Sequence, residues 1–446
     1  MKLKTILAGA MALGITSSAM AQTTEITITG ATAFRQATMQ AIYDAYASAG
    51  GLGNTFNVCH DFNGNNLSQL IASNKAVFSG TFPGITGTTV IRTSFNGSTE
   101  GLNAIAGNND PTFLQTAALL NTGSIQGSTT TPTEALRPKF SFSDVYQSTS
   151  PVDNEVLNPV GASAVGVVTF TMIANEGAPA DLNNVTIQQA RQLWTSGIQP
   201  LSLFTGDPTD TTWVLATGRN DGSGTRAAYL TEWTYGVANL VNQYIATKTG
   251  ITGNDITALT LVPADGKGSG NFETSGTSNA STLWGQTATG NGGYSSSSAL
   301  RSLMGYASSS VDIYNGVDNS PDVEDTTVVL LTWLSTADAR NAASNGGKLL
   351  SYNGVGVTPI AAAGSYLLSG FNEADFKKIT SGAYSAWSYQ HLYYHGNLSA
   401  NENTWYTAMK NTWIPQGLAI TSNGLELGDM GVSRPDDGFP IVAPVL

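Results

Sequence analysis

Charged side chains are scarce in this chain. Only 11% of its 446 residues are Asp, Glu, Lys or Arg, and the acidic residues outnumber the basic ones by 31 to 19. An acidic chain is poorly suited to bind nucleic acid or an anionic membrane, so we expect neither as a partner. A small anion remains compatible with this charge, because local hydrogen-bond donors build such a site. The 49 glycines, with abundant Ser, Thr and Asn, predict a polar, mostly uncharged surface, a composition that a β-rich adhesin would share.

Cysteine and histidine are also rare. The single cysteine, Cys59, excludes an internal disulfide, and we expect it to be a small buried hydrophobe. Cys59-His60-Asp61 lacks a second spaced cluster of ligands, so we do not predict a metal site there. His391 and His395 have the spacing of a shared helix face, but their neighbours fit a strand or a packed segment equally well. We therefore predict neither a metal nor a cofactor.

Beyond its first residues the chain has no run apolar enough to span a bilayer. The start has Lys2 and Lys4, an apolar run over Ile6–Ile15, and the small-residue site Ala19-Met20-Ala21. This pattern is typical of a secretory signal peptide, so we interpret residues 1–21 as one and expect the mature chain to begin at Gln22. We expect a periplasmic protein without a lipid anchor, because no cysteine follows the cleavage site.

Three segments change from strand-like alternation, through a glycine-containing turn, to helical spacing. They begin at Glu25–Gly30, Val90–Phe95 and Trp213–Ala216, and the helix expected after the third covers Ala227–Ala246. This repetition indicates an α/β fold that binds ligands at its turns. A continuous apolar run over Ala164–Ala174 predicts a central, buried strand.

Two further segments, Thr122–Thr133 and Gly266–Ser298, are poor in apolar residues and rich in Gly, Ser, Thr and Asn. That composition predicts surface loops or insertions. Val185–Trp194, by contrast, has helical spacing.

The most informative segment is Gly218–Arg226, which reads Gly-Arg-Asn-Asp-Gly-Ser-Gly-Thr-Arg between a predicted strand and a predicted helix. A Gly- and Ser-rich turn at a helix start leaves several backbone N–H groups without a partner, at the positive end of the helix dipole. The hydroxyls of Ser223 and Thr225 and the guanidinium of Arg219 add further donors. Together these groups suit a tetrahedral oxyanion.

Three other turns have residues suited to the same receptor. They read Thr-Gly-Ala-Thr-Ala-Phe-Arg over Thr29–Arg35, Asn-Gly-Ser-Thr-Glu-Gly over Asn96–Gly101, and Phe-Ser-Asp-Val over Phe142–Val145. A single Gly-Ser turn before a helix is more often a plain helix cap than an anion site. Four such segments in one chain are stronger evidence for an anion site than a single one.

With these four segments, the chain resembles the periplasmic phosphate-binding proteins that feed an ABC transporter. The resemblance covers most of the chain after the leader and is poor in the two predicted insertions. It implies a two-lobed type II periplasmic binding fold, in which each lobe is a mixed, mostly parallel sheet flanked by helices. Lobe 1 would hold residues 22–168 and 387–446, lobe 2 would hold 169–386, and the crossovers near Thr169 and Ala386 would act as the hinge.

The resemblance also implies which residues bind the anion between the lobes. By position they are Thr32, Ala33, Phe34, Ser98, Asp144, Arg219, Ser223, Gly224 and Thr225. The chain departs from the family pattern at Ala33, which takes the place of the family's threonine. It departs again at Thr99 and Glu100, where the family often has glycine.

The family's aspartate, here Asp144, would lie against the anion. An ionised carboxylate only accepts hydrogen bonds, and hydrogen phosphate has a proton to donate whereas sulfate has none. A buried Asp144 would therefore favour phosphate and repel sulfate.

We accordingly predict a binding protein and not an enzyme: it would capture inorganic phosphate and deliver it to an inner-membrane ABC permease, and we expect a monomer. Three alternatives stay open. A secreted phosphatase or other hydrolase would need a catalytic base, which the scarcity of histidine disfavours. A surface or adhesion protein could keep the fold without transport, and a binding protein could take sulfate, molybdate or tungstate instead.

Overall fold

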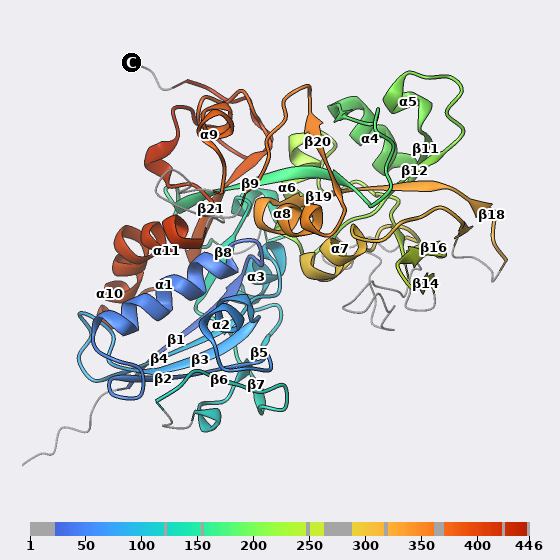
Figure 1. Ribbon diagram of the computed structural model, residues 1–446. Helices are drawn as coiled ribbons and strands as arrows, with labels where there is room; N and C mark the ends of the chain where they lie inside the picture. Colours follow the sequence, from blue (N-terminus) through green and yellow to red (C-terminus); the bar gives the residue numbers. More distant parts are fainter. Residues whose placement is uncertain are drawn as a thin grey trace, which may run out of the picture.

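The structure is a computed structural model that describes residues 23–119, 123–152, 156–246, 250–262, 288–315, 320–360, 370–421 and 424–443. Helices and strands alternate in two lobes, as Figure 1 shows. The predicted signal peptide, residues 1–21, lies outside the described residues. Among the helices that are described, none is long and apolar enough to cross a membrane.

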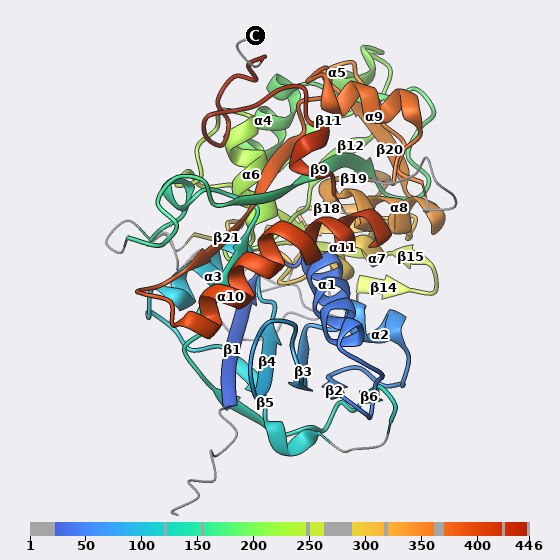
Figure 2. The same cartoon turned by 90° about the vertical axis from the view of Figure 1, so that its left-hand side faces the viewer.

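The first lobe contains the N-terminal elements. They are β1 (Thr23–Gly30), α1 (Arg35–Ser48), β2 (Phe56–His60), α2 (Leu67–Ala72), β3 (Lys75–Gly80), β4 (Thr88–Ser94), α3 (Ser98–Ile105), β5 (Thr112–Leu114), β6 (Gln126–Gly127), β7 (Thr133–Ala135) and β8 (Phe140–Ser143). The chain returns to this lobe at its end, with β21 (Trp387–Tyr394), α10 (Ala400–Ala408) and α11 (Ile414–Thr421). Helix α11 packs against α1, as Figure 2 shows.

The second lobe contains the middle of the chain, which follows the long strand β9 (Ala164–Ala174). Its helices are α4 (Ile187–Ser196), α5 (Ser202–Thr205), α6 (Gly224–Glu232), α7 (Ser297–Leu303), α8 (Thr336–Ser344) and α9 (Glu373–Thr380). Its strands are β10 (Asn184–Val185), β11 (Ile198–Pro200), β12 (Trp213–Ala216), β13 (Tyr244–Ile245), β14 (Ile251–Thr252), β15 (Asp255–Ile256), β16 (Ala258–Leu261), β17 (Val311–Tyr314), β18 (Val323–Thr326), β19 (Val328–Ser335) and β20 (Lys348–Tyr352).

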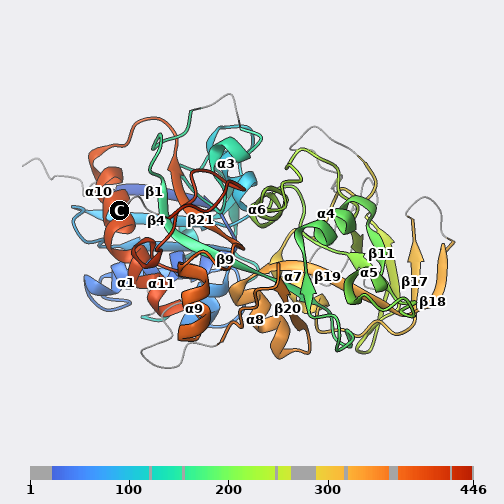
Figure 3. The same ribbon diagram turned by 90° about the horizontal axis from the view of Figure 1, so that it is seen from above.

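Strand β9 belongs to both lobes and joins their sheets. The strand order along the sheet is β11-β12-β19-β9-β21-β8-β1-β4-β3-β2-β6. The first half of β9 pairs with β21, up to Thr169 opposite Trp387, and its second half pairs with β19, from Phe170 opposite Ser335. The predicted crossovers near Thr169 and Ala386 therefore lie where β9 changes partners, at the junction seen from above in Figure 3.

The sheet is mixed, as predicted, but fewer of its pairs are parallel than expected. Strand β1 pairs parallel with β4 and β8, and β12 pairs parallel with β19. Strands β3, β9 and β21 pair antiparallel with their neighbours. The two-lobed α/β class predicted from the sequence is confirmed.

Each lobe buries its own aromatic centre. In the first lobe Tyr46 stacks on Phe56 and Phe78, and its hydroxyl donates to the Thr89 carbonyl at 2.8 Å. In the second lobe Trp233 packs between Trp194 and Trp333, with ring centroids 4.8 and 5.8 Å away. Such rings bury large apolar areas, so each lobe has a core that can hold its binding turns in place.

Most predicted elements are confirmed within a few residues. The strands expected at Glu25–Gly30, Trp213–Ala216 and Ala164–Ala174 are β1, β12 and β9, and the apolar β9 is buried along nearly its whole length. The helix expected over Val185–Trp194 is α4. Cys59 is buried, as expected, on β2.

The helix predicted over Ala227–Ala246 is wrong beyond Glu232. Helix α6 ends there, because Thr234 and Gly236 adopt positive φ angles of 54° and 95° that a helix does not allow. Tyr244 and the residue after it form the short strand β13 instead. The prediction followed the apolar spacing alone and extended the helix past Gly236, a residue type that commonly ends helices.

A buried ion pair joins the end of α6 to the C-terminal segment. Arg434 donates to Glu232 at 2.9 Å, and the two side chains are 4% and 10% exposed. Glu232 also accepts a hydrogen bond from Ser385 at 2.6 Å. Burial raises the pKa of Glu232, although the charge of Arg434 opposes this.

We expect Glu232→Gln to lower the free energy of unfolding by about 3–5 kcal/mol, because the variant leaves the Arg434 charge buried without its partner. Urea denaturation of the two proteins measures the difference. The matched control is Glu373→Gln, which removes an exposed i,i+4 pair with Lys377 and should leave the midpoint unchanged. Equal midpoints for Glu232→Gln and the unaltered protein would contradict the prediction.

Candidate functional site

The turn after β1 is fixed by a glycine that no other residue can replace. Gly30 has a φ angle of +110°, and a Cβ atom there would collide with the backbone of Phe142 on β8. Ala31 N–H donates to the Phe142 carbonyl at 2.8 Å, and Gly97 N–H donates to the Gly30 carbonyl at 2.9 Å. The turns after β1, β4 and β8 are therefore held together through backbone contacts.

Helix α1 begins directly after this turn. Phe34 is its N-cap residue, and no side chain caps the helix there. Ala33 and Phe34 are both buried, and the Phe34 ring packs against Phe142, 5.7 Å between centroids. The Phe34 side chain thus belongs to the first core, and only its backbone is available to a ligand at the helix start.

The second and third turns meet at Ser98 and Asp144. Ser98 begins α3, and its hydroxyl accepts a hydrogen bond from the Asp144 backbone N–H at 3.0 Å. Both residues are 1% exposed, and the Asp144 Oδ1 atom has no hydrogen-bond partner among the described residues. Burial raises the pKa of Asp144 to about 7, and the hydrogen bond with Ser98 and the charge of Arg219 oppose this only in part.

The fourth turn, after β12, carries Arg219 into the same junction. Arg219 is fully buried. Its guanidinium donates to the carbonyls of Tyr294 and Ser295, at 3.0 and 3.1 Å, and to the Ser297 hydroxyl at 3.0 Å. It also reaches across to the first lobe, where the Thr32 hydroxyl accepts at 3.4 Å.

Burial lowers the pKa of Arg219 to about 10, which still leaves it charged at neutral pH. The carboxylates of Asp338 and Asp144 act in the opposite direction, while Arg35 adds to the lowering. Asp338 is itself paired with Arg301 at 3.1 Å. The junction therefore holds buried positive charge that its own carboxylates do not fully balance, a condition that favours an anion.

Helix α6 begins in this turn and touches α3. Ser223 caps α6 by accepting from the Arg226 N–H at 3.4 Å. A Cβ atom on Gly224 would collide with the Ser98 hydroxyl and lie 3.0 Å from Asp144 Oδ2. Only a glycine lets the start of α6 approach so closely to the residues that begin α3 and follow β8.

Two hydrogen bonds close the lobes around this point. The Thr99 hydroxyl donates to the Asp221 carbonyl at 2.7 Å, and Glu100 N–H donates to the Gly222 carbonyl at 3.2 Å. The Glu100 carboxylate accepts a hydrogen bond from the Asn109 amide through one oxygen, and its other oxygen lies beside Gly222 of the fourth turn.

The four turns predicted from sequence therefore meet at one junction between the lobes. Direct contacts join Thr32 to Arg219, Ser98 to Asp144, and Gly224 to Ser98 and Asp144. The remaining predicted residues, Ala33, Phe34, Ser223 and Thr225, are the chain neighbours of these and are buried. That they bind phosphate stays a prediction.

Solved structures similar to this chain are phosphate transport proteins by description. One is a protein assigned as a phosphate ABC transporter substrate-binding protein, with bound phosphate, from Clostridium perfringens, at 11% identity and a TM-score of 0.43, covering 90% of this chain and 99% of that one. A second is an ABC-type phosphate transport receptor from Vibrio cholerae, at 10% identity and a TM-score of 0.42, covering 90% of this chain and 99% of that one. A third is PstS from Borrelia burgdorferi, at 10% identity and a TM-score of 0.33, covering 89% of this chain and 97% of that one. No protein-family model and no curated protein matches the chain. Identities and TM-scores this low carry no argument about what the chain binds.

The structure adds site residues that the sequence reading missed. Tyr294, Ser295 and Ser297 hold Arg219, yet they lie in the stretch Gly266–Ser298 that was predicted to be a surface loop. Residues 266–287 of that stretch are outside the described chain, but Tyr294 and Ser297 are buried, so the prediction is wrong at its end. The only local signal was the run of four serines at 295–298.

His391 has a structural role. His391 lies on the strand β21, where the sequence had left helix and strand open, and its ring bonds the Ser163 hydroxyl at 2.8 Å. Burial lowers the pKa of His391 to about 3, so it is neutral. Within the described ranges, no three His, Cys, Asp or Glu side chains gather as a metal site would require.

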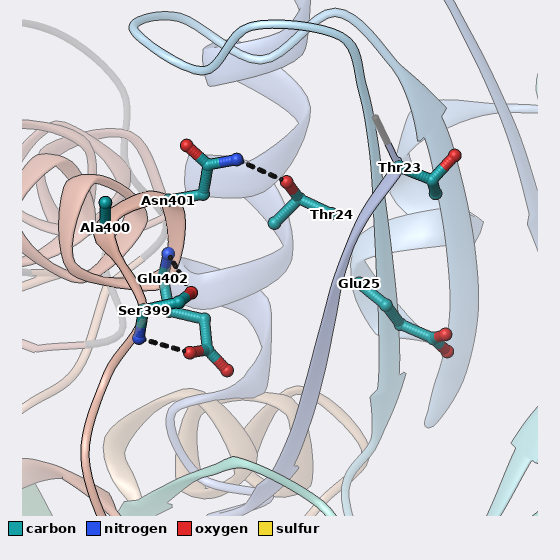
Figure 4. A pocket seen from close by; sticks show the side chains of 7 residues that line it. All are labelled: Thr23, Thr24, Glu25, Ser399, Ala400, Asn401 and Glu402. Carbon is teal, nitrogen blue, oxygen red and sulfur yellow. Dashed lines mark hydrogen bonds between the residues drawn. The ribbon is translucent and has the colours of Figure 1, made fainter. Parts of the chain in front are cut away.

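An open pocket of about 350 Å³ lies far from the junction, beside β1 and the start of α10, and is shown in Figure 4. The Ser399 N–H donates to Glu402 at 2.7 Å, so α10 satisfies its own first turn, and Asn401 donates to the Thr24 hydroxyl at 2.7 Å. These bonds join α10 to β1 and leave no buried polar group of the pocket waiting for a ligand. We interpret the pocket as the place where α10 packs against β1 within the first lobe.

We expect Asp144→Asn to stabilise the protein at pH 8. The folded protein holds the Asp144 proton up to about pH 7, whereas the unfolded chain releases it near pH 4, so this group's contribution to stability falls as the pH rises from 4 to 7. The side-chain amide of the variant carries no charge, so the variant does not lose this stability as the pH rises. Thermal unfolding from pH 4 to 8 measures the difference, which should be largest at pH 8 and fade toward pH 4. A difference independent of pH would contradict the buried state of Asp144.

Proposed function

We propose that this chain is an extracytoplasmic solute-binding protein that captures hydrogen phosphate between its lobes and delivers it to an ABC permease. The observation that carries the proposal is that Arg219 and Asp144 are both buried at the same junction, where the charge of each affects the pKa of the other. A guanidinium and a carboxyl group, both buried, meet at the starts of α3 and α6, next to that of α1. Such a set offers many donors and one acceptor, which is the complement of a phosphate that keeps one proton.

The donors come from both lobes. In this proposal the backbone N–H groups after Thr32 and the Ser98 hydroxyl bind from the first lobe, while Arg219, Ser223 and the N–H groups of Gly224 and Thr225 bind from the second. An anion that contacts both sides stabilises the closed arrangement, because only that arrangement brings all the donors within reach. The two bodies that move would be lobe 1, residues 22–168 with 387–446, and lobe 2, residues 169–386.

The same geometry supports binding over catalysis. The Ser223 hydroxyl is engaged as the cap of α6, and Ser98 is hydrogen-bonded to Asp144, a carboxyl group that the proposal assigns to the proton of the bound phosphate. His391 is neutral, buried and bonded to Ser163. We propose a monomer, secreted through the predicted signal peptide, that releases its ligand unchanged.

Calorimetric titration of the mature chain, stripped of carried-over ligand, tests the proposal. We expect one phosphate per protein, and we expect Arg219→Lys to weaken binding about 10- to 100-fold, because a lysine cannot keep the fork of charged hydrogen bonds. Arg191→Lys, which changes an exposed arginine on α4, is the matched control and should bind as the unaltered protein does. Absence of phosphate binding in the unaltered protein would move the surface or adhesion reading to first place.

Sulfate tests the role of Asp144. At pH 8 the unaltered protein should not bind sulfate, because sulfate has no proton to donate to the ionised Asp144 carboxylate and the two negative charges repel each other. Asp144→Asn should bind sulfate at the same pH, and the unaltered protein should begin to do so below about pH 7, where Asp144 gains its proton. Unchanged selectivity in the variant would remove Asp144 from the site.

A further inference from the structure

The chain after α11 runs back over the junction between the lobes. Figure 3 shows its dark red trace above β9 and β21. Leu425 pairs with Val167 of β9 through two backbone hydrogen bonds of 2.9 Å, which places the segment at the shared strand. From there, residues 426–443 continue across both lobes.

Two adjacent aspartates, Asp436 and Asp437, bond this segment to the first lobe, close to Asp144. The Asp437 carboxylate accepts from the Tyr146 backbone N–H at 2.7 Å, and the Asp436 carboxylate accepts from the Ser148 hydroxyl at 3.0 Å. Tyr146 and Ser148 lie in the loop that follows β8, two and four residues after Asp144. The loop that carries Asp144 is thus bonded to the C-terminal segment.

The residues on either side of these aspartates contact the second lobe, at the end of the helix whose start forms the candidate site. Arg434 pairs with Glu232, the last residue of α6, at 2.9 Å. Gly438 has a φ angle of +70° and lies against Thr231 of α6, whose carbonyl a Cβ atom would strike. Both contacts fall within two residues of each other on α6.

Arg434 also holds the chain where it crosses between the lobes. It donates to the carbonyls of Ser385 and Trp387, at 2.9 and 3.1 Å, which flank Ala386. Its guanidinium lies 4.5 Å from the centre of the Trp387 ring. One buried arginine therefore contacts α6 and the crossover together.

We propose that residues Arg434–Gly438 form a tie that holds the two lobes closed, and that the lobes separate only when this tie detaches from one of them. The tie bonds the loop of Asp144 on one side and the helix of Ser223 and Gly224 on the other. Opening the lobes would pull these two anchors apart, so the tie favours the closed state even without a ligand. Its existence is independent of which anion binds, whereas its effect on ligand exchange rests on the proposed function.

The double variant Asp436→Ala/Asp437→Ala removes the first anchor, and Gly438→Val weakens the second through its clash with Thr231. The matched control is Glu426→Ala, which removes an exposed carboxylate that accepts a hydrogen bond from the Asp429 backbone N–H of the same segment. All proteins are compared without ligand by small-angle X-ray scattering. Release of phosphate from the loaded proteins is then followed by dilution into competitor.

We expect a larger radius of gyration for both tie variants. Phosphate release should be faster by about tenfold or more in the double variant, which loses hydrogen bonds to two carboxylates, and should also be faster in Gly438→Val. The control should match the unaltered protein in both measurements. If phosphate does not bind at all, the proposed function fails, but the scattering still tests the tie. An unchanged radius of gyration in both variants, with folding verified by circular dichroism, would overturn it.

Discussion

Burial of the Arg219 charge is the constraint on which the rest of this structure depends. A guanidinium removed from water needs an acceptor for each of its donors and a counter-charge. Tyr294, Ser295 and Ser297 supply acceptors, while Asp144 and Asp338 supply only part of the charge. Arg219 thus lies buried where the turn before α6 meets the start of α3.

The long strand β9 makes that junction possible. Because β9 pairs with β21 in one half and with β19 in the other, the two sheets meet edge to edge in fixed register. The turns after β1, β4 and β8 then face the turn after β12. Glycines at positions 30, 97 and 224 allow the backbones to approach, since a side chain at any of them would strike the opposite turn. The lobes thus share the strand β9, and glycines let their turns approach each other.

The C-terminal segment connects the candidate site to the crossover. Its contacts reach the loop after Asp144, the end of α6, and the residues around Ala386. Helix α6 links the two, since Ser223 at its start belongs to the candidate cradle and Glu232 at its end pairs with Arg434 of the tie.

The sequence by itself determined the local pieces: β1, β9 and β12, the helix starts at Ser98 and Gly224, and the four turns. Each depends on alternation, glycine positions and helix caps among neighbouring residues. Only the tertiary structure decided where α6 ends, that Glu100 turns to Asn109, and that Tyr294 and Ser297 hold Arg219. The contacts of Arg219 with Tyr294 and Ser297 join residues 75 and 78 positions apart, and the pKa of Asp144 follows from its burial at the same junction. No local pattern encodes burial of this kind, because it arises only when the two lobes meet.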